Sequence, residues 1–154
     1  MNAIAYQYKC ANCDLQFRAP ETPEFSYGMF VLRTANSDYA AFLYAITDSA
    51  FLESGELVKK HPQISKLHDR ERALIQQQIY GMICDKTPTG GTLVIGMPPK
   101  CPSCGSRKME SWEQISPTEA WPLPVVEHKS WDSKSAVEKF NIIERLIQEV
   151  LAKK

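Results

Sequence analysis

The chain has 154 residues, of which 44% are apolar and 23% are charged, and its 18 Lys and Arg balance 18 Asp and Glu. This length and composition are typical of one soluble domain with a core of its own, and they exclude collagenous, low-complexity and wholly disordered chains. The formal net charge of zero also excludes a strongly basic protein that coats nucleic acid through its overall field.

The first ten residues contain neither a charged segment nor an apolar run of the kind found in secretory signals. No stretch of about 18 apolar residues occurs in the chain, so we expect a cytoplasmic protein without a membrane span. In a reducing cytosol, cysteines at short spacing are more often metal ligands or redox centres than disulfides.

The N-terminal part predicts a strand, a cysteine turn and a strand over residues 6–17, and a further strand over residues 25–33. Ser37 or Asp38 is expected to cap a helix over residues 39–51, because apolar side chains recur there at helical spacing. A short second helix is expected over residues 54–60, before Pro62.

The clearest helix of the middle region is expected to begin at Asp69 and to keep its apolar spacing up to Ile83. Short strands are expected over residues 92–95 and 109–115. Residues 116–131 alternate Pro with Trp and Val, which indicates an extended segment that packs across another surface. Asp132 or Ser133 is expected to cap a terminal amphipathic helix.

Two Cys-x-x-Cys knuckles are the clearest motifs, and they comprise Cys10 with Cys13 and Cys101 with Cys104. Four thiolates satisfy a tetrahedral zinc ion completely and leave no open coordination position. Gly105 follows the second knuckle, where a residue without Cβ adopts the positive φ that such turns use. The pattern therefore predicts a structural metal site.

The residues around both knuckles resemble the zinc-ribbon superfamily: Tyr-x-Cys-x-x-Cys-x-x-x-Phe over residues 8–17 and Cys-Pro-x-Cys-Gly-Ser over residues 101–106. The resemblance covers under a third of the chain. It implies one structural Zn²⁺ per chain, with four ligands: Cys10, Cys13, Cys101 and Cys104. Zinc ribbons serve transcription, translation and protein docking, so the resemblance selects no single function.

The spacing of the knuckles departs from that family, because 87 residues separate Cys13 from Cys101 and a compact ribbon has roughly 15–20 there. Stretching the loop costs roughly 1.4 kcal/mol, whereas structural zinc contributes on the order of 10–16 kcal/mol. We therefore expect an α+β fold, in which a zinc ribbon with a small antiparallel sheet is interrupted by an inserted α/β unit. The expected units are two ribbon halves (1–24 and 97–115), the insertion (25–96), a Pro/Trp-rich extended arm (116–132) and a C-terminal amphipathic helix (133–154).

Other chemistry has less support in the residues. Disulfides remain an alternative, and so does a thiol oxidoreductase at Cys101-Pro-Ser-Cys104, although exchange motifs need a cysteine at a helix N-terminus and no helical pattern follows Gly105. Cys84 stands outside both knuckles and is expected to be a buried free thiol. No nucleotide-binding loop, hydrolase elbow or His-containing metal motif occurs, so we expect no enzymatic activity.

The distribution of charge favours a protein partner over nucleic acid. Residues 1–34 carry three basic and three acidic side chains, and residues 97–131 carry four of each. Binding to backbone phosphates needs a surplus of Lys and Arg on one face. A nucleic-acid-associated ribbon in transcription or translation is therefore the alternative, and an adaptor, regulator or inhibitor of a partner protein, such as an immunity or antitoxin-like protein, is the first expectation.

Two C-terminal features are candidates for the partner surface. Trp112, Trp121 and Trp131 lie within 20 residues of one another; such segments mark interfaces, or else pack on the protein's own core. The terminal helix is expected either to dock back onto the chain or to pair with a second copy in a homodimer.

Overall fold

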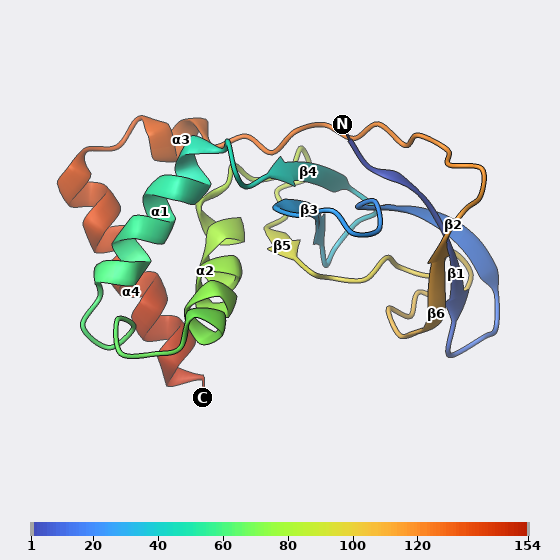
Figure 1. Cartoon of the computed structure of the whole chain (residues 1–154), viewed down its shortest axis with the longest axis horizontal. Coiled ribbons are helices and arrows are strands. Elements are labelled where there is room, and N and C mark those ends of the chain that lie inside the picture. Colours follow the sequence, from blue (N-terminus) through green and yellow to red (C-terminus); the bar gives the residue numbers. More distant parts are fainter. Residues whose placement is uncertain (1, 154) are drawn as a thin grey trace.

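The computed structural model describes residues 2–153 as a mixed α+β protein with two small antiparallel sheets and four helices. In Figure 1 the helices gather at one end, one sheet lies at the opposite end and the second sheet lies between them. The elements are β1 (Ile4–Cys10), β2 (Gln16–Glu21), β3 (Met29–Thr34), β4 (Ala40–Tyr44), α1 (Ser49–Lys60), α2 (Asp69–Ile83), β5 (Leu93–Ile95), β6 (Met109–Gln114), α3 (Lys129–Asp132) and α4 (Ala136–Ala152).

The sheet with strand order β2-β1-β6, here called the knuckle sheet, joins segments from distant parts of the chain. Tyr8 in β1 lies opposite both Phe17 in β2 and Trp112 in β6. Their rings stack across the sheet, with centroids 5.7 Å apart for Tyr8 and Phe17 and 6.3 Å apart for Tyr8 and Trp112. The predicted strand, cysteine turn and strand near the N-terminus are thus confirmed.

The sheet with strand order β4-β3-β5, here called the central sheet, shares one large core with the helices. Nineteen buried residues form this core, and they come from the central sheet, α1, α2, α3, α4 and the segments between them. Helix α2 approaches β5 so closely that a Cβ at Gly81 would overlap with the carbonyl oxygen of Leu93. The predicted helix over residues 69–83 and the short strand near residue 93 are confirmed.

The predicted helix over residues 39–51 is wrong. Residues Ala40–Tyr44 form β4, and the helix begins at Ser49, where the Asp48 side chain accepts a hydrogen bond from the Phe51 amide. The first four residues of β4 are all buried. A strand that is buried on both faces reads as a continuous apolar run, which periodicity cannot distinguish from a helix. The predicted break before residue 54 is also absent, because α1 is continuous over Ser49–Lys60.

The segment of residues 116–128, here called the arm, lies along both sheets (Figure 1). The Trp121 amide donates to the Ala3 carbonyl at 2.9 Å, and the Phe42 amide in β4 donates to the Pro124 carbonyl at 2.8 Å. The expectation of an extended segment that packs across another surface is confirmed for residues 116–128, which cover the outer edge of β4, but it is wrong for residues 129–132 of the predicted arm, which form α3.

Helix α4 begins later than predicted. Its N-cap is Ser135, not Asp132 or Ser133, because Ser135 and Glu138 form a reciprocal capping box, while Asp132 ends the single turn of α3. Four residues of its apolar face enter the core with α1 and α2: Ile143, Leu146, Ile147 and Val150. The helix therefore docks back onto the chain, and a homodimer through it stays a prediction.

The expected unit 25–96 contains β3, β4, α1, α2 and β5, and the expected ribbon halves contain β1, β2 and β6. Side chains of α4 share one core with the unit 25–96. The domain boundaries themselves stay a prediction. Within residues 2–153, none of the helices is both long enough and apolar enough to cross a membrane.

Candidate metal centre

The two cysteine knuckles have the same backbone geometry. The Cys10 amide donates to the Leu15 carbonyl at 2.9 Å, and the Cys101 amide donates to the Ser106 carbonyl at 2.8 Å. The residue after each second cysteine, Asp14 or Gly105, donates back to the carbonyl of the first cysteine, at 3.1 and 2.9 Å respectively.

Both turns need a left-handed residue at that position, with φ of 63° at Asp14 and 77° at Gly105. The expectation for Gly105 is confirmed. The matching conformation at Asp14 was not foreseen, although Asp adopts it more readily than most residues with a Cβ.

The knuckle sheet brings the four cysteine sulfurs together in one cluster. All four Sγ atoms lie within 4.8 Å of one another, with Cys10 and Cys104 separated by 3.5 Å and Cys13 and Cys101 by 3.6 Å. Four sulfurs at about 2.3 Å from a central ion stand about 3.8 Å apart at the corners of a regular tetrahedron. The cluster is therefore able to hold one metal ion and is consistent with a zinc-ribbon-like site.

Hydrogen bonds within the cluster set the thiol pKa values apart. A hydrogen bond with the Asn12 side chain lowers the pKa of Cys104 to about 6. At Cys13 a hydrogen bond with the Leu15 backbone lowers the pKa, but loss of solvent and hydrogen bonds with the other three thiols outweigh it and raise the pKa to about 12. A cation bound by four thiolates would displace the protons of these thiols.

Two arginines, of which Arg33 is buried and Arg107 is half-buried, join the knuckle sheet and the second knuckle to the central sheet. The Arg33 guanidinium donates to the carbonyls of Pro20 and Met97 and lies 3.5 Å from a carboxylate oxygen of Glu21. The Arg107 guanidinium donates to the Pro98 carbonyl at 2.7 Å and the Thr34 carbonyl at 2.8 Å. Sequence reasoning counted both arginines only as charge and missed this role.

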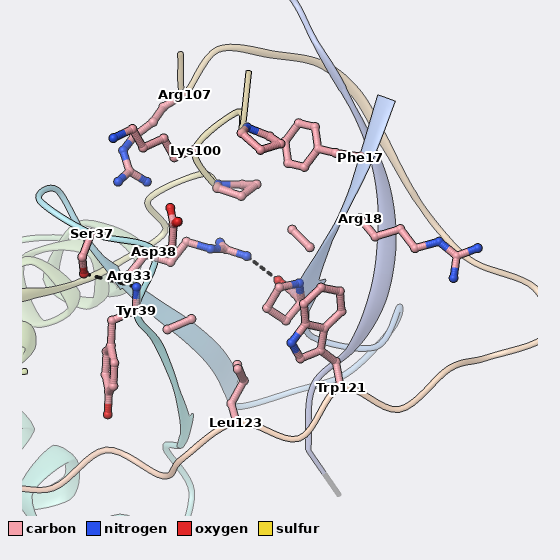
Figure 2. A pocket seen from close by; sticks show the side chains of 15 residues that line it. Phe17, Arg18, Arg33, Ser37, Asp38, Tyr39, Lys100, Arg107, Trp121 and Leu123 are labelled. Carbon is pink, nitrogen blue, oxygen red and sulfur yellow. Dashed lines mark hydrogen bonds between the residues drawn. The ribbon is translucent and has the colours of Figure 1, made fainter. Parts of the chain in front are cut away.

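These contacts border a pocket of about 260 Å³ between the knuckle sheet, β3 and the arm. In Figure 2 the Arg33 guanidinium extends across the pocket toward the side where Trp121 lies, and Arg18 points away from the pocket. Most of the N–H groups of the Arg33 guanidinium donate to acceptors of the protein itself. The role of Arg33 in this pocket is therefore to join the two sheets.

The three tryptophans do not form one surface. Trp112 lies on β6 and is 58% exposed, and Trp121 is half-buried in the arm. Trp131 in α3 is 1% exposed, and its indole N–H donates to Glu53 at 2.8 Å. Trp131 therefore packs on the protein's own core. Of the three tryptophans, Trp112 has the largest surface open to a partner.

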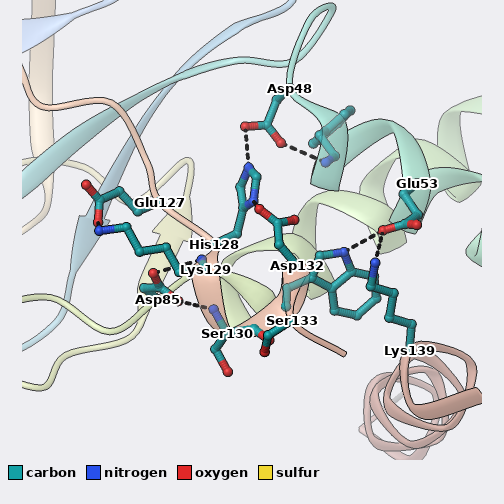
Figure 3. Close-up of polar contacts among 12 residues, drawn as sticks. Asp48, Glu53, Asp85, Glu127, His128, Lys129, Ser130, Asp132, Ser133 and Lys139 are labelled. Atoms are coloured by element: carbon teal, nitrogen blue, oxygen red, sulfur yellow. Dashed lines mark hydrogen bonds and ion pairs between the residues drawn. The ribbon is translucent and has the colours of Figure 1, made fainter. Parts of the chain in front are cut away.

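A second polar cluster surrounds α3 (Figure 3). The His128 ring places Nε2 3.1 Å from Asp48 and Nδ1 2.9 Å from Asp132. Two ring nitrogens that both face carboxylate oxygens require the doubly protonated imidazolium. Burial lowers the pKa of His128, but the two carboxylates outweigh it and raise that pKa.

The remaining cysteine lies away from the cluster. Cys84 is 7% exposed and belongs to the core of the helical end, which confirms the expected buried thiol. Burial raises its pKa to about 12, so it stays a protonated and unreactive thiol at neutral pH.

The sequence alone located the four cysteines, but it did not locate the Asp48–His128–Asp132 contacts, which join the N-terminal end of α1 to α3. Comparison with known proteins adds no identity to this geometry. No model of a protein family matches the chain, and neither a curated protein nor a solved structure matches it.

Proposed function

We propose that the chain is a non-catalytic protein that holds one structural Zn²⁺ at the four clustered cysteines and binds a partner protein as an adaptor, regulator or inhibitor. The observation that carries the metal assignment is the packing of four sulfurs from two matched knuckles: Cys10, Cys13, Cys101 and Cys104. Four sulfur ligands close the coordination of the ion, which suits a structural zinc and leaves no position for a substrate.

Burial supports a structural role for this centre. Cys10 and Cys101 are buried, and Cys13 and Cys104 are exposed. The ion would connect the turn between β1 and β2 to the turn before β6, so it would fix these two turns of the knuckle sheet relative to each other. In the described residues no helix begins at Cys101, which argues against the thiol oxidoreductase alternative.

Ion pairing supports a protein partner over nucleic acid. Three basic side chains of the knuckle sheet and β3 lie within 4 Å of carboxylates: Lys9 with Glu110 at 2.9 Å, Arg18 with Glu119 at 2.6 Å and Arg33 with Glu21 at 3.5 Å. Cations that are already paired are poor ligands for a phosphate backbone. An inhibitor that occludes an enzyme, as an immunity or antitoxin-like protein does, is one form of the proposed role.

Metal analysis tests the zinc centre. The purified protein should contain about one zinc ion per chain, and the Cys10→Ser, Cys104→Ser double variant should lose the metal together with the folded knuckle sheet. Cys84→Ser is the matched control, because this cysteine lies outside the cluster, and it should keep the metal. Protein that carries no metal and whose four thiols cycle with a redox buffer would contradict the proposal in favour of an oxidoreductase.

Binding assays separate the two partner classes. A protein recovered with the chain from the source cell should bind again when both are purified, and this binding should depend on the intact zinc centre. Binding to single-stranded or duplex nucleic acid that weakens steeply with salt would favour the alternative, a nucleic-acid-associated ribbon.

A further inference from the structure

One edge of the knuckle sheet has unused hydrogen-bonding groups. The Ile115 amide donates to the Ala5 carbonyl, so residues 111, 113 and 115, which lie on the same side of the register shift at Lys9/Cys10, turn their backbone groups toward β1. Alternation along an antiparallel strand then turns the amide and carbonyl of Trp112 toward the outside of the sheet. Among residues 2–153, no backbone hydrogen bond beyond the pairing with β1 involves Trp112 or Gln114.

The other sheet edges are covered at more points, although on β2 the outward backbone groups of Gln16 and Arg18 have no hydrogen bond among the described residues. The same alternation turns Pro20 of β2 outward, where it has no N–H, and its carbonyl accepts from Arg33. The arm covers β4 through its hydrogen bonds with Phe42. Helix α2 packs against β5 at Gly81. The edge of β6 combines outward backbone groups with an apolar cleft lined by Trp112, so it is the place where a further strand fits best.

An apolar cleft lies beside this edge. It measures about 900 Å³ between the knuckle sheet and the central sheet, and Tyr8 and Trp112 form part of one wall. Three of the five methionines in the chain line it: Met29, Met97 and Met109. Methionine and aromatic side chains adapt to apolar groups of varied shape, which is typical of surfaces that accept a partner's side chain.

The rim of the cleft carries positive charge. Within the cleft Arg33 is paired with Glu21, whereas Arg107 and Lys108 line the cleft with no ion pair among the described residues. The Arg107 guanidinium donates to carbonyl oxygens, which carry no net charge, so its positive charge is not neutralised. An acidic group on the occupant would complement this rim.

We infer that an extended segment of the partner protein adds to β6 as a fourth strand of the knuckle sheet. Its backbone pairs with the outward groups of Trp112, an apolar side chain enters the methionine-lined cleft, and an adjacent Asp or Glu faces Arg107 and Lys108. Main-chain pairing supplies affinity and the cleft supplies selectivity. This inference rests on the proposed partner-binding role and names its surface.

Peptides of defined design test the surface without the natural partner. The parent probe is an acetylated peptide of about nine residues that alternates Thr with Leu and has Asp at both ends. Two matched peptides carry N-methyl groups on one or the other set of alternate amides. Only one set faces β6, so one methylated peptide should bind about tenfold more weakly and the other should match the parent.

Amide hydrogen exchange reports the site directly. The Trp112 amide should exchange rapidly in the free protein and at least about tenfold more slowly with saturating parent peptide. The Ser111 amide, which faces β1, is the internal control and should change little. Replacing the terminal Asp residues with Lys should weaken binding a few-fold at low salt and less at high salt.

Variants of the zinc-loaded full chain complete the test. Trp112→Ala should lose about thirtyfold in affinity for the parent peptide, as expected for a central aromatic contact. Gln114→Pro removes an outward amide and should weaken binding with the fold retained. Phe140→Ala, at a side chain that is 57% exposed on α4, is the matched control and should bind normally.

The inference is overturned by three results: no peptide of the panel binds, both methylated peptides bind equally, or a single-stranded oligonucleotide but not the peptides slows exchange at Trp112. A partner from the source cell that binds Trp112→Ala and Gln114→Pro as tightly as the unaltered chain would overturn the inference and leave the proposed function standing. If only one of the two methylated peptides binds as the parent does, but no partner protein is found in the source cell, the inferred binding surface would stand and the proposed function would not.

Discussion

The two ends of the molecule are stabilised by different interactions. The helical end has a core of nineteen buried residues, whereas the apolar core of the knuckle sheet has four: Ile4, Tyr6, Tyr8 and Ala19. A small sheet with one exposed face buries too little apolar surface to offset the loss of chain entropy. Domains of that size usually contain disulfides or a metal as well. The four cysteines cluster at the turns of the knuckle sheet, where a bound metal would stabilise it. The two ends should therefore unfold independently of each other.

The largest expected effect is that of removing the metal. Chelation should expose the knuckle sheet to solvent, because it would lose a contribution on the order of 10 kcal/mol. Amide exchange should then become fast at Tyr8 and stay slow at Ile79 in the core of α2. Loss of protection at both positions at equal chelator concentration would break the comparison, because it would mean that the two ends unfold as one.

A pair of tryptophan variants should give the next largest effect. Trp131→Ala should lower the free energy of unfolding by about 3–5 kcal/mol, because it leaves a cavity in the core. Trp112→Ala should change it by less than about 1 kcal/mol, since that ring is 58% exposed. Urea unfolding followed by circular dichroism at the helical band measures the effect of Trp131→Ala, and amide exchange at Tyr8 in the knuckle sheet measures that of Trp112→Ala. A larger loss for Trp112→Ala would contradict the assignment of Trp112 to a partner surface.

The contact of α2 with β5 gives a third test. Gly81→Ala should destabilise the helical end by about 1–3 kcal/mol, because the added methyl group meets backbone atoms that cannot move aside. Gly55→Ala in α1 is the matched control, since its methyl group meets the flexible side chain of Gln76, and it should stay within about 0.5 kcal/mol. Thermal unfolding distinguishes the two. Equal melting temperatures would show that the α2–β5 approach is loose.

The smallest expected effect depends on pH. The raised pKa of His128 means that its protonated ring stabilises the fold in full below the unfolded value of about 6.5, and that this stabilisation is lost as the pH rises through the folded pKa. The free energy of unfolding of the unaltered chain should therefore fall over that window relative to His128→Gln. His68→Gln, at a position without a side-chain cap contact, is the control and should follow the unaltered chain. Parallel curves for His128→Gln and the unaltered chain would contradict the charged state assigned to this ring.

The sequence predicted features that depend on local pattern. The knuckles, Gly105, the helix from Asp69 and the mixed α+β class follow from spacing and turn chemistry, which act over a few residues. The strand over Ala40–Tyr44 could not be told from a helix, because both of its faces are buried and its apolar residues are continuous.

Contacts between distant segments were out of reach of sequence reasoning. The placement of Arg33 against Pro20 and of His128 between two carboxylates depends on how the elements pack. The pairing of the knuckles could be predicted because four ligands to one ion impose proximity whatever the length between them. No such rule applies to Trp112 and Trp131, whose opposite environments depend on the elements that carry them.

The 87 residues between the knuckles also set a schedule for synthesis of the chain. At about 5–20 residues per second, a ribosome needs roughly 4–17 s to proceed from Cys13 to Cys101. During that interval the nascent chain contains two thiols of the cluster and a β1 strand that has β2 on one side, while its other neighbour, β6, has not been made. The four-cysteine cluster is complete only after the second knuckle has left the ribosome, so any capture of a metal by all four thiols would follow synthesis of the whole segment between the knuckles.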